Sequence, residues 1–263
     1  MEKIKIIITG AAGRMGSTLV NLILESNDLE LVGLIERKET LDKLSHLGIR
    51  KSTSIEEIFK ENANTNVVVI DFTSPENTIN TAYLAEKYKI AHVIGTTGLS
   101  ADQKEILTTL SQTNKIFFSP NMSIGINVLL KVLPQLTKML GMDYDVEMVE
   151  LHHNKKKDSP SGTALRLAEC LADAKNWKLD EVANYHREGI IGERPKEEIG
   201  IQTIRGGDVV GVHTMYFMGA GERIEVTHQA HSRENFAQGA LRAAKWINAQ
   251  PLGKLYEILD MFN

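Results

Sequence analysis

The sequence contains a single cysteine and no long apolar run. Because Cys170 is the only cysteine in 263 residues, no disulfide can form within the chain, and a reducing compartment is expected. The longest aliphatic runs, such as residues 67–70, have four residues, whereas a membrane-spanning helix needs about 18. The chain opens with Met1, Glu2 and Lys3 and then enters an apolar segment, unlike a secretory signal. These features predict a cytoplasmic protein with no membrane partner.

An excess of positive charge is also lacking. The chain has 30 Lys and Arg against 34 Asp and Glu, which gives a net charge of −4, and its pI is near 6.1. Since domains that bind nucleic acid usually have a pI above about 9, no nucleic-acid partner is expected. Hydrophobic residues make up 42% and charged residues 24%, a globular composition that excludes disordered and fibrous proteins. The length corresponds to one or two domains of about 100–200 residues each.

The first half of the sequence alternates short apolar strands with helical segments. The strands are expected at residues 4–8, 30–35, 67–72, 90–94 and 115–118, and the helices at 15–26, 55–60, 74–89 and 101–113. Continuous apolar strands separated by helices are typical of a parallel sheet that is covered on both faces. Connections of this kind are right-handed, so the pattern predicts an α/β fold with a Rossmann-like, doubly wound parallel sheet.

The pattern changes after Pro120. Helices are expected at 124–140, 163–174 and 236–248, a strand at 143–151, and a β-rich stretch at 200–226. On the first strand, Val146, Met148 and Glu150 are expected to lie on different faces. Meandering strands of this kind form an antiparallel or mixed open sheet that leaves one face for a partner. We therefore expect an α+β second domain at residues 124–232, and a first domain of residues 1–123 plus 233–263.

A glycine-rich segment, Gly10-Ala11-Ala12-Gly13-Arg14-Met15-Gly16, joins the first strand to the first helix. Amides at a helix N-terminus attract phosphate, and glycines allow a close approach. The spacing is G-x-x-G-x-x-G rather than the stricter G-x-G-x-x-G. Glu36 lies twenty residues after Gly16, where a carboxylate would accept hydrogen bonds from an adenosine ribose. A dinucleotide site is favoured over a plain turn followed by a solvated glutamate.

The next residue, Arg37, bears on the choice of coenzyme. An arginine beside the acid can pair with the 2′-phosphate of NADP, so both NADH and NADPH are expected to bind. The alternative is an ordinary surface pair of Glu36 and Arg37. Ligands of parallel sheets bind at the carboxyl ends of the strands. The expected nicotinamide end is therefore lined by the residues that follow the fourth and fifth strands: Gly95, Thr96, Thr97, Ser119, Pro120, Asn121 and Met122.

The segment 150–163 combines two histidines, three lysines and a helix start. His152 and His153 are adjacent at a strand end, so they point to opposite faces and are not expected to do the same job. Ser161 is a favourable N-cap residue, and the amides around Gly162 and Thr163 would hold an anion. The segment predicts a pocket for a small carboxylate substrate, with histidine transferring a proton near neutral pH.

Two other interpretations of this segment remain. A run of lysines is often a solvated basic loop, and at least one of the three is expected to face solvent. A metal site at the two histidines lacks a third ligand at any familiar spacing, so no metal is expected.

Together these motifs resemble the dihydrodipicolinate reductase family of bacterial lysine and diaminopimelate synthesis. Residues 150–163 are similar to its E-x-H-H-x-x-K-x-D-x-P-S-G-T signature, with Ser159 where Ala is usual. The likeness covers essentially the whole chain. It includes residues 10–16, 71–73, 95–98, 187–189 and 206–211.

The resemblance implies that the chain reduces 4-hydroxy-tetrahydrodipicolinate (dihydrodipicolinate) to tetrahydrodipicolinate with a hydride from NADH or NADPH. His152 matches the proton donor or acceptor, and Lys156 matches the catalytic lysine. Substrate contacts match His153, Ser161, Gly162 and Thr163. Cofactor positions match residues 10–15, Glu36, Arg37, 95–97 and 119–122, with Ser119 and Pro120 replacing a more typical small pair. Members are generally homotetramers built through the sheet of the second domain, which implies the same assembly here.

Two other functions remain as alternatives. A dehydrogenase of the aspartate-semialdehyde type needs a nucleophilic cysteine, but Cys170 lies on an expected helix between the core-like residues Leu167 and Leu171. A non-catalytic sensor of NAD(P) would have no use for the pocket expected at residues 152–163.

Overall fold

A computed structural model describes residues 3–262, which divide into two compact units. The first unit contains the described residues up to Ile124 together with those from Arg233 onward, and the second is Gly125–Ser232. Each unit has its own sheet and its own apolar core. No helix in residues 3–262 combines the length and the apolar character needed to cross a membrane.

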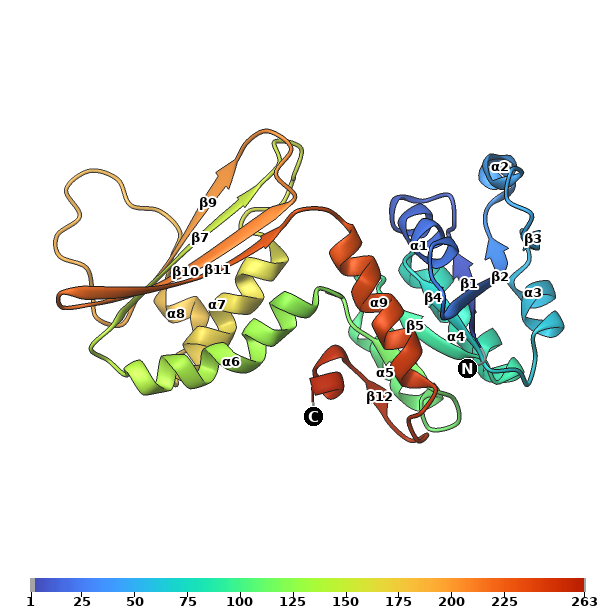
Figure 1. Cartoon of the computed structure of the whole chain (residues 1–263). Helices are drawn as coiled ribbons and strands as arrows, with labels where there is room; N and C mark the ends of the chain where they lie inside the picture. The colour runs from blue at the N-terminus through green and yellow to red at the C-terminus, as the bar shows by residue number, and fades with distance from the viewer. Residues whose placement is uncertain (1–2, 263) are drawn as a thin grey trace. The chain divides into compact units, whose positions relative to one another are not determined.

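The first unit is built on a seven-stranded parallel sheet (Figure 1). Its strands are β1 (Ile4–Thr9), β2 (Leu29–Ile35), β3 (Lys51–Ser52), β4 (Val67–Asp71), β5 (Ala91–Ile94), β6 (Ile116–Phe118) and β12 (Leu255–Tyr256). The spatial order is β12-β6-β5-β4-β1-β2-β3. The helices are α1 (Arg14–Leu24), α2 (Lys38–Leu41), α3 (Ile55–Glu61), α4 (Pro75–Tyr88), α5 (Ala101–Leu110) and α9 (Glu234–Ile247), with 3₁₀ turns at Asp42–Leu44 and Ile258–Phe262. The predicted Rossmann-like fold is confirmed.

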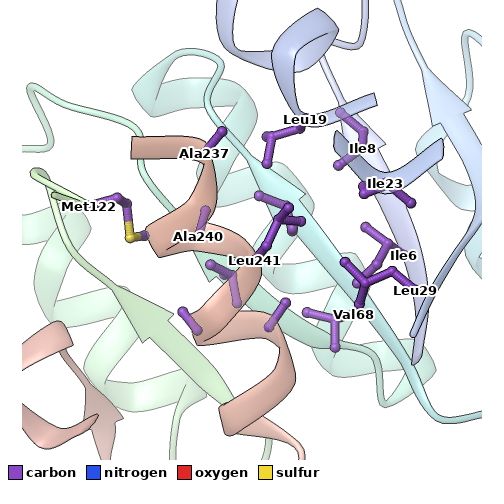
Figure 2. Packing of buried hydrophobic residues seen from close by; sticks show 14 of the residues in the cluster. Ile6, Ile8, Leu19, Ile23, Leu29, Val68, Met122, Ala237, Ala240 and Leu241 are labelled. Carbon is purple, nitrogen blue, oxygen red and sulfur yellow. The ribbon is translucent and has the colours of Figure 1, made fainter. Parts of the chain in front are cut away.

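Both faces of this sheet are buried because β1 alternates between two cores. Ile6 and Ile8 point into a core with α1 and α9, and Ile7 points into another core with α3 and α4. Figure 2 shows the first of these cores, with Leu19 and Ile23 of α1 and Ala237, Ala240 and Leu241 of α9. The last helix of the chain therefore completes the first unit.

The second unit is built on a five-stranded mixed sheet with the order β11-β10-β7-β9-β8. Its strands are β7 (Asp145–His152), β8 (Ala183–Asn184), β9 (Ile199–Arg205), β10 (Gly211–Gly219) and β11 (Glu222–Ala230). β9 is parallel to β7 and β8, whereas β10 is antiparallel to β7 and β11. The helices are α6 (Ile124–Leu140), α7 (Gly162–Ala174) and α8 (Leu179–Val182). α6 and α7 lie on one face of the sheet (Figure 1). The predicted mixed sheet is confirmed.

The covered face of this sheet changes from apolar to polar along β7. Val146 and Met148 are buried against the helices, and the two-residue period of a strand places Glu150 and His152 on the same face. The expectation that Val146, Met148 and Glu150 lie on different faces was therefore wrong. The buried side of β7 thus ends in a buried acid, Glu150, near the point where α7 begins.

Candidate active site

The glycine-rich segment forms a tight turn between β1 and α1. Gly10 has a φ of +63°, a conformation that favours glycine, and its N–H donates to the Ile35 carbonyl at 2.9 Å. The Gly13 N–H donates back to the Gly10 carbonyl at 2.9 Å, and α1 starts at the next residue. A Cβ on Gly16 would lie 2.1 Å from the Gly10 carbonyl oxygen, so α1 packs directly against the turn. The turn has the geometry of a phosphate-binding helix N-terminus.

Glu36 is buried and ties this turn to the end of β2. Its Oε2 accepts from the Ala12 N–H at 2.7 Å, and its Oε1 accepts from the Arg37 N–H at 2.8 Å. The Arg37 side chain is 85% exposed, and its Nε lies 3.9 Å from Glu36 Oε1. The carboxylate keeps a fixed position, while the guanidinium extends into solvent.

Two cavities lie along the carboxyl ends of the parallel strands. The larger, about 770 Å³, is lined by Gly10, Ala12, Gly13, Glu36 and Arg37 together with Asn77 of α4. The smaller, about 360 Å³, is lined by Arg14, Met15 and Pro120, by residues 95–97, and by Arg233 and Phe236 from the end of the chain. Both cavities are lined in part by Phe72 and Thr73, so they lie next to each other in the first unit.

Three of the predicted cofactor residues, Ala11, Ser119 and Asn121, line neither of these two cavities, and Met122 lines only the smaller one. Ala11 and Met122 belong to the apolar core, although Met122 also lines the smaller cavity. Ser119 is buried and donates through Oγ to the Asn121 carbonyl at 2.8 Å. The Asn121 side-chain oxygen accepts from the Ser123 N–H at 2.9 Å. These side chains shape the turn after β6.

The second unit brings Glu150, His152 and Arg205 together at the polar end of its covered face. The Glu150 side chain is fully buried, and its Oε2 lies 2.5 Å from His152 Nδ1. The Arg205 guanidinium donates to both carboxylate oxygens at 2.8 Å, and the Ser161 N–H donates to Oε1 at 2.9 Å. Burial alone would raise the pKa of Glu150, but these hydrogen bonds, that of Arg205 above all, lower it to about 2. Glu150 is therefore a carboxylate at neutral pH.

His152 contacts a second buried histidine. The ring of His213 packs edge-on against it, with centroids 5.2 Å apart, and His213 Nε2 lies 3.2 Å from Ser161 Oγ. Burial lowers the pKa of His213 to about 4. Burial also lowers the pKa of His152, although Glu150 opposes the change. Both rings are therefore neutral at pH 7.

The lysine-rich loop presents one of its three lysines to this cluster. The side chain of Lys156 is 21% exposed, and its Nζ lies 3.0 Å from Asp158 Oδ1. Lys155 and Lys157 are exposed, which confirms that part of the run faces solvent. His153 follows β7, and its Nδ1 accepts from the Lys155 N–H at 3.2 Å, so the two histidines occupy different surroundings.

α7 begins beside the same cluster. Ser161 caps the helix, since its Oγ accepts from the Ala164 N–H at 3.1 Å. Gly162 and Thr163 are the first two helical residues, so their amides stand at the positive end of the helix. A cation, a helix N-terminus and a buried histidine thus meet at one place, as anion binding combined with proton transfer requires.

The sequence analysis assigned no role to Glu150, Arg205 or His213. The available signal was weak: Glu150 and Arg205 lie near the carboxyl ends of β7 and β9, but β7 also carries Asp145 and Glu147. The register that pairs His152 with Arg205 and Glu150 with His213 brings these residues together, and it cannot be read from local sequence.

The low pKa of Glu150 predicts a loss of stability in acid. A carboxyl whose pKa falls on folding stabilises the protein above its unfolded pKa, and this stabilisation is lost as the pH falls through the folded pKa. For Glu150 the window runs from 4.5 down to about 2, and the expected loss is about 3 kcal/mol. Urea unfolding across this window should show a shallower pH dependence for Glu150→Gln than for the wild type. Identical slopes would contradict the assignment.

Comparison with known proteins is consistent with this geometry. The family model described as "Dihydrodipicolinate reductase, N-terminus" matches residues 4–122, and "Dihydrodipicolinate reductase, C-terminus" matches residues 125–262. A 4-hydroxy-tetrahydrodipicolinate reductase of Nitratidesulfovibrio vulgaris (strain Miyazaki F) is 62% identical over 97% of this chain and 98% of its own. The enzyme of the same name from Oleidesulfovibrio alaskensis is 57% identical over 98% and 99%.

Solved structures show the same fold. A dipicolinate-bound dihydrodipicolinate reductase from Paenisporosarcina sp. TG-14 superposes with a TM-score of 0.78 at 24% identity, over 99% of this chain and 100% of its own. A probable dehydrogenase from Thermotoga maritima has a TM-score of 0.58 at 14% identity, over 95% and 91%.

Proposed function

The chain belongs to the dihydrodipicolinate reductase family, and from this premise we propose which of its residues bind the cofactor and the substrate. It is an oxidoreductase of lysine synthesis that reduces 4-hydroxy-tetrahydrodipicolinate. The observation that carries the residue assignment is that Glu150 joins His152 to Ser161 at the start of α7, with the charge of Lys156 acting on His152. The two cavities of the first unit would form the cofactor site.

The cofactor assigned to the first unit is NADH or NADPH, which supplies a hydride when bound. Residues 10–15 would hold its pyrophosphate, because the turn places a helix N-terminus at the larger cavity and Gly13 lacks a Cβ that would narrow it. Glu36, fixed by two backbone amides, is placed to accept from ribose hydroxyls. Residues 95–97 and the turn 119–122 would surround the nicotinamide end at the smaller cavity.

We assign Arg37 to the discrimination between the two coenzymes, with both accepted. Its exposed guanidinium is able to reach a 2′-phosphate, and one such charge-assisted contact is worth about 1.4 kcal/mol. Arg37→Ala is therefore expected to raise the KM for NADPH about 10-fold and to leave the KM for NADH within about 2-fold. The exposed neighbour Lys38 does not line the cavity, so Lys38→Ala is the matched control. Equal changes for both coenzymes in Arg37→Ala would contradict the assignment.

The substrate assigned to the second unit is a cyclic dicarboxylate. Lys156 would bind one carboxylate as a cation, and the amides of Gly162 and Thr163, with Ser161 and His153 beside them, would bind the other. Loss of the 4-hydroxyl as water leaves a ring carbon conjugated with the imine. Hydride addition to that carbon would then leave an electron-rich ring that takes up one proton. His152 and Lys156 are the ionisable groups that would take part in this proton transfer.

We also propose that the protein assembles as a homotetramer through the uncovered face of the second sheet. Val149 and Leu151 of β7 alternate with the residues that face α7, and with Val212 and Tyr216 of β10 they give this face an apolar character. Light scattering at micromolar concentration measures the assembly directly. A cytoplasmic location is supported by the single cysteine of the chain.

The assay that tests the activity couples this protein to the preceding synthase, supplied with pyruvate and aspartate semialdehyde. Reduced-nicotinamide absorbance should fall with NADH and with NADPH. Binding of either coenzyme without turnover would instead favour the sensor.

A further inference from the structure

The hydrogen bonds around Glu150 leave one arrangement for His152. Oε1 accepts from the Ser161 N–H and from Arg205, and Oε2 accepts from Arg205 and faces His152 Nδ1 at 2.5 Å. A carboxylate is an acceptor only, and the low pKa of Glu150 keeps it ionised. A lone pair on Nδ1 would face a buried negative charge, so Nδ1 carries the proton.

The other ring nitrogen is then fixed as well. In a neutral imidazole with a proton on Nδ1, Nε2 has a lone pair and no proton to give. The charged and titratable groups that face the ring are Glu150 from β7, Arg205 from β9, His213 from β10 and Lys156 from the following loop. Burial and the two cations oppose a second proton on His152, and Glu150 alone favours it.

We infer that Glu150, held by Arg205, is a positioning residue that fixes His152 in the Nδ1–H tautomer and presents Nε2 to the substrate as a hydrogen-bond acceptor. This inference rests on the proposed function of the site. The proton that completes the reduction then comes from Lys156: one N–H bond of its ammonium breaks as the ring gains a proton, and the neutral amine regains a proton from water. The hydride, with its electron pair, comes from the coenzyme.

Glu150→Gln tests the inference because the glutamine side chain replaces one of the two acceptor oxygens with an NH₂ donor. Its single oxygen is best used by the Ser161 N–H and Arg205 at the Oε1 position, so its NH₂ group would face Nδ1 and favour the opposite tautomer. We expect kcat to fall about 100-fold, the lower end of the range for general acid–base groups. NADH binding should not change, since every residue lining its cavities belongs to the first unit.

The pH profile separates positioning from a merely structural role. If Nε2 acts as an acceptor, wild-type activity falls in acid as His152 becomes protonated. Removing the negative charge of Glu150 lowers the pKa of His152 further, so this acid limb should move to lower pH in Glu150→Gln. Two results for Glu150→Gln would overturn the inference: a lower kcat with the acid limb at its wild-type pH, or an unchanged kcat. A rate of the wild type that rises toward acid pH would overturn it as well.

Glu147→Gln is the matched control. Glu147 lies on the same strand and is also paired with two arginines, Arg187 and Arg194, but it faces the other side of the sheet. It should show a comparable loss of stability with turnover retained. If His152→Ala keeps full turnover, the proposed function of the site fails; if His152→Ala is impaired but Glu150→Gln is not, only the present inference fails.

A second readout remains if Glu150→Gln does not fold. Long-range ¹H–¹⁵N correlation spectra of the ¹⁵N-histidine-labelled wild type report the protonation of each ring nitrogen, with His152 assigned from a His152→Asn sample. A protonated Nδ1 and an unprotonated Nε2 are expected near pH 7. The reverse pattern overturns the inference.

Arg205→Lys tests the hold on Glu150. The positive charge remains, but the pair of hydrogen bonds to the two carboxylate oxygens is lost, so kcat should fall about 10-fold.

Discussion

Replacing Lys156 by alanine is expected to lower kcat about 1,000-fold, because the variant loses both a cation for a substrate carboxylate and the proposed proton source. The Lys156 side chain is largely buried in its loop, beside the charges of the His152 cluster. The Kd for NADH should stay within about 2-fold of wild type, since Lys156 lines neither cavity of the first unit. Steady-state kinetics together with fluorescence titration of NADH measure both effects.

The neighbouring lysine provides the control. Lys157 carries the same charge in the same loop but is exposed, so Lys157→Ala should retain nearly full turnover. Equal losses in the two variants would show that the loop acts only through its overall charge. Full turnover in Lys156→Ala would remove Lys156 from the mechanism.

The second large effect is expected from Gly16→Ala in the phosphate-binding turn. The added Cβ would lie 2.1 Å from the Gly10 carbonyl oxygen and 2.7 Å from the Ala11 Cα, both of which are backbone atoms. α1 must therefore move away from β1, and the amides of residues 13–15 move with it. Overpacking of this kind costs about 1–3 kcal/mol of folding free energy, and we expect the Kd for NADH to rise at least about 100-fold.

Gly48→Ala controls for the substitution itself. Gly48 lies in the same unit, and nothing lies within 4 Å of the Cβ that an alanine would add there. Its NADH affinity and its free energy of unfolding should match the wild type. Unchanged NADH binding in Gly16→Ala would exclude residues 10–15 as the pyrophosphate site.

The fold of the first unit could be predicted because its signals are local. β1, β2 and β4 are apolar runs that end at turn residues, and the glycine turn precedes a helical period. The strands β3, β8 and β12 have two residues each, too few to show a period, and none was predicted. They form by pairing with longer strands, which is a tertiary effect.

The candidate active site could be predicted only in part. The segment 150–163 contains His152, Lys156 and the start of α7, so its chemistry was visible in the sequence. The environment of His152 was not, because Arg205 and His213 come from strands more than 50 residues away and join it through register alone. Glu150 was not expected on the same face as Val146 and Met148, because ionised side chains are rarely buried beside apolar ones. The guanidinium of Arg205 is what makes that position tolerable.

The central claim is that a ring held by the second unit receives hydride directly from a coenzyme held by the first. Its most direct test is a single turnover with NADH that carries deuterium at both C4 positions, followed by mass spectrometry of the reduced product. The account predicts a product one mass unit heavier than that formed with ordinary NADH. An unlabelled product, with the deuterium lost to water, would contradict direct transfer and with it the proposed arrangement.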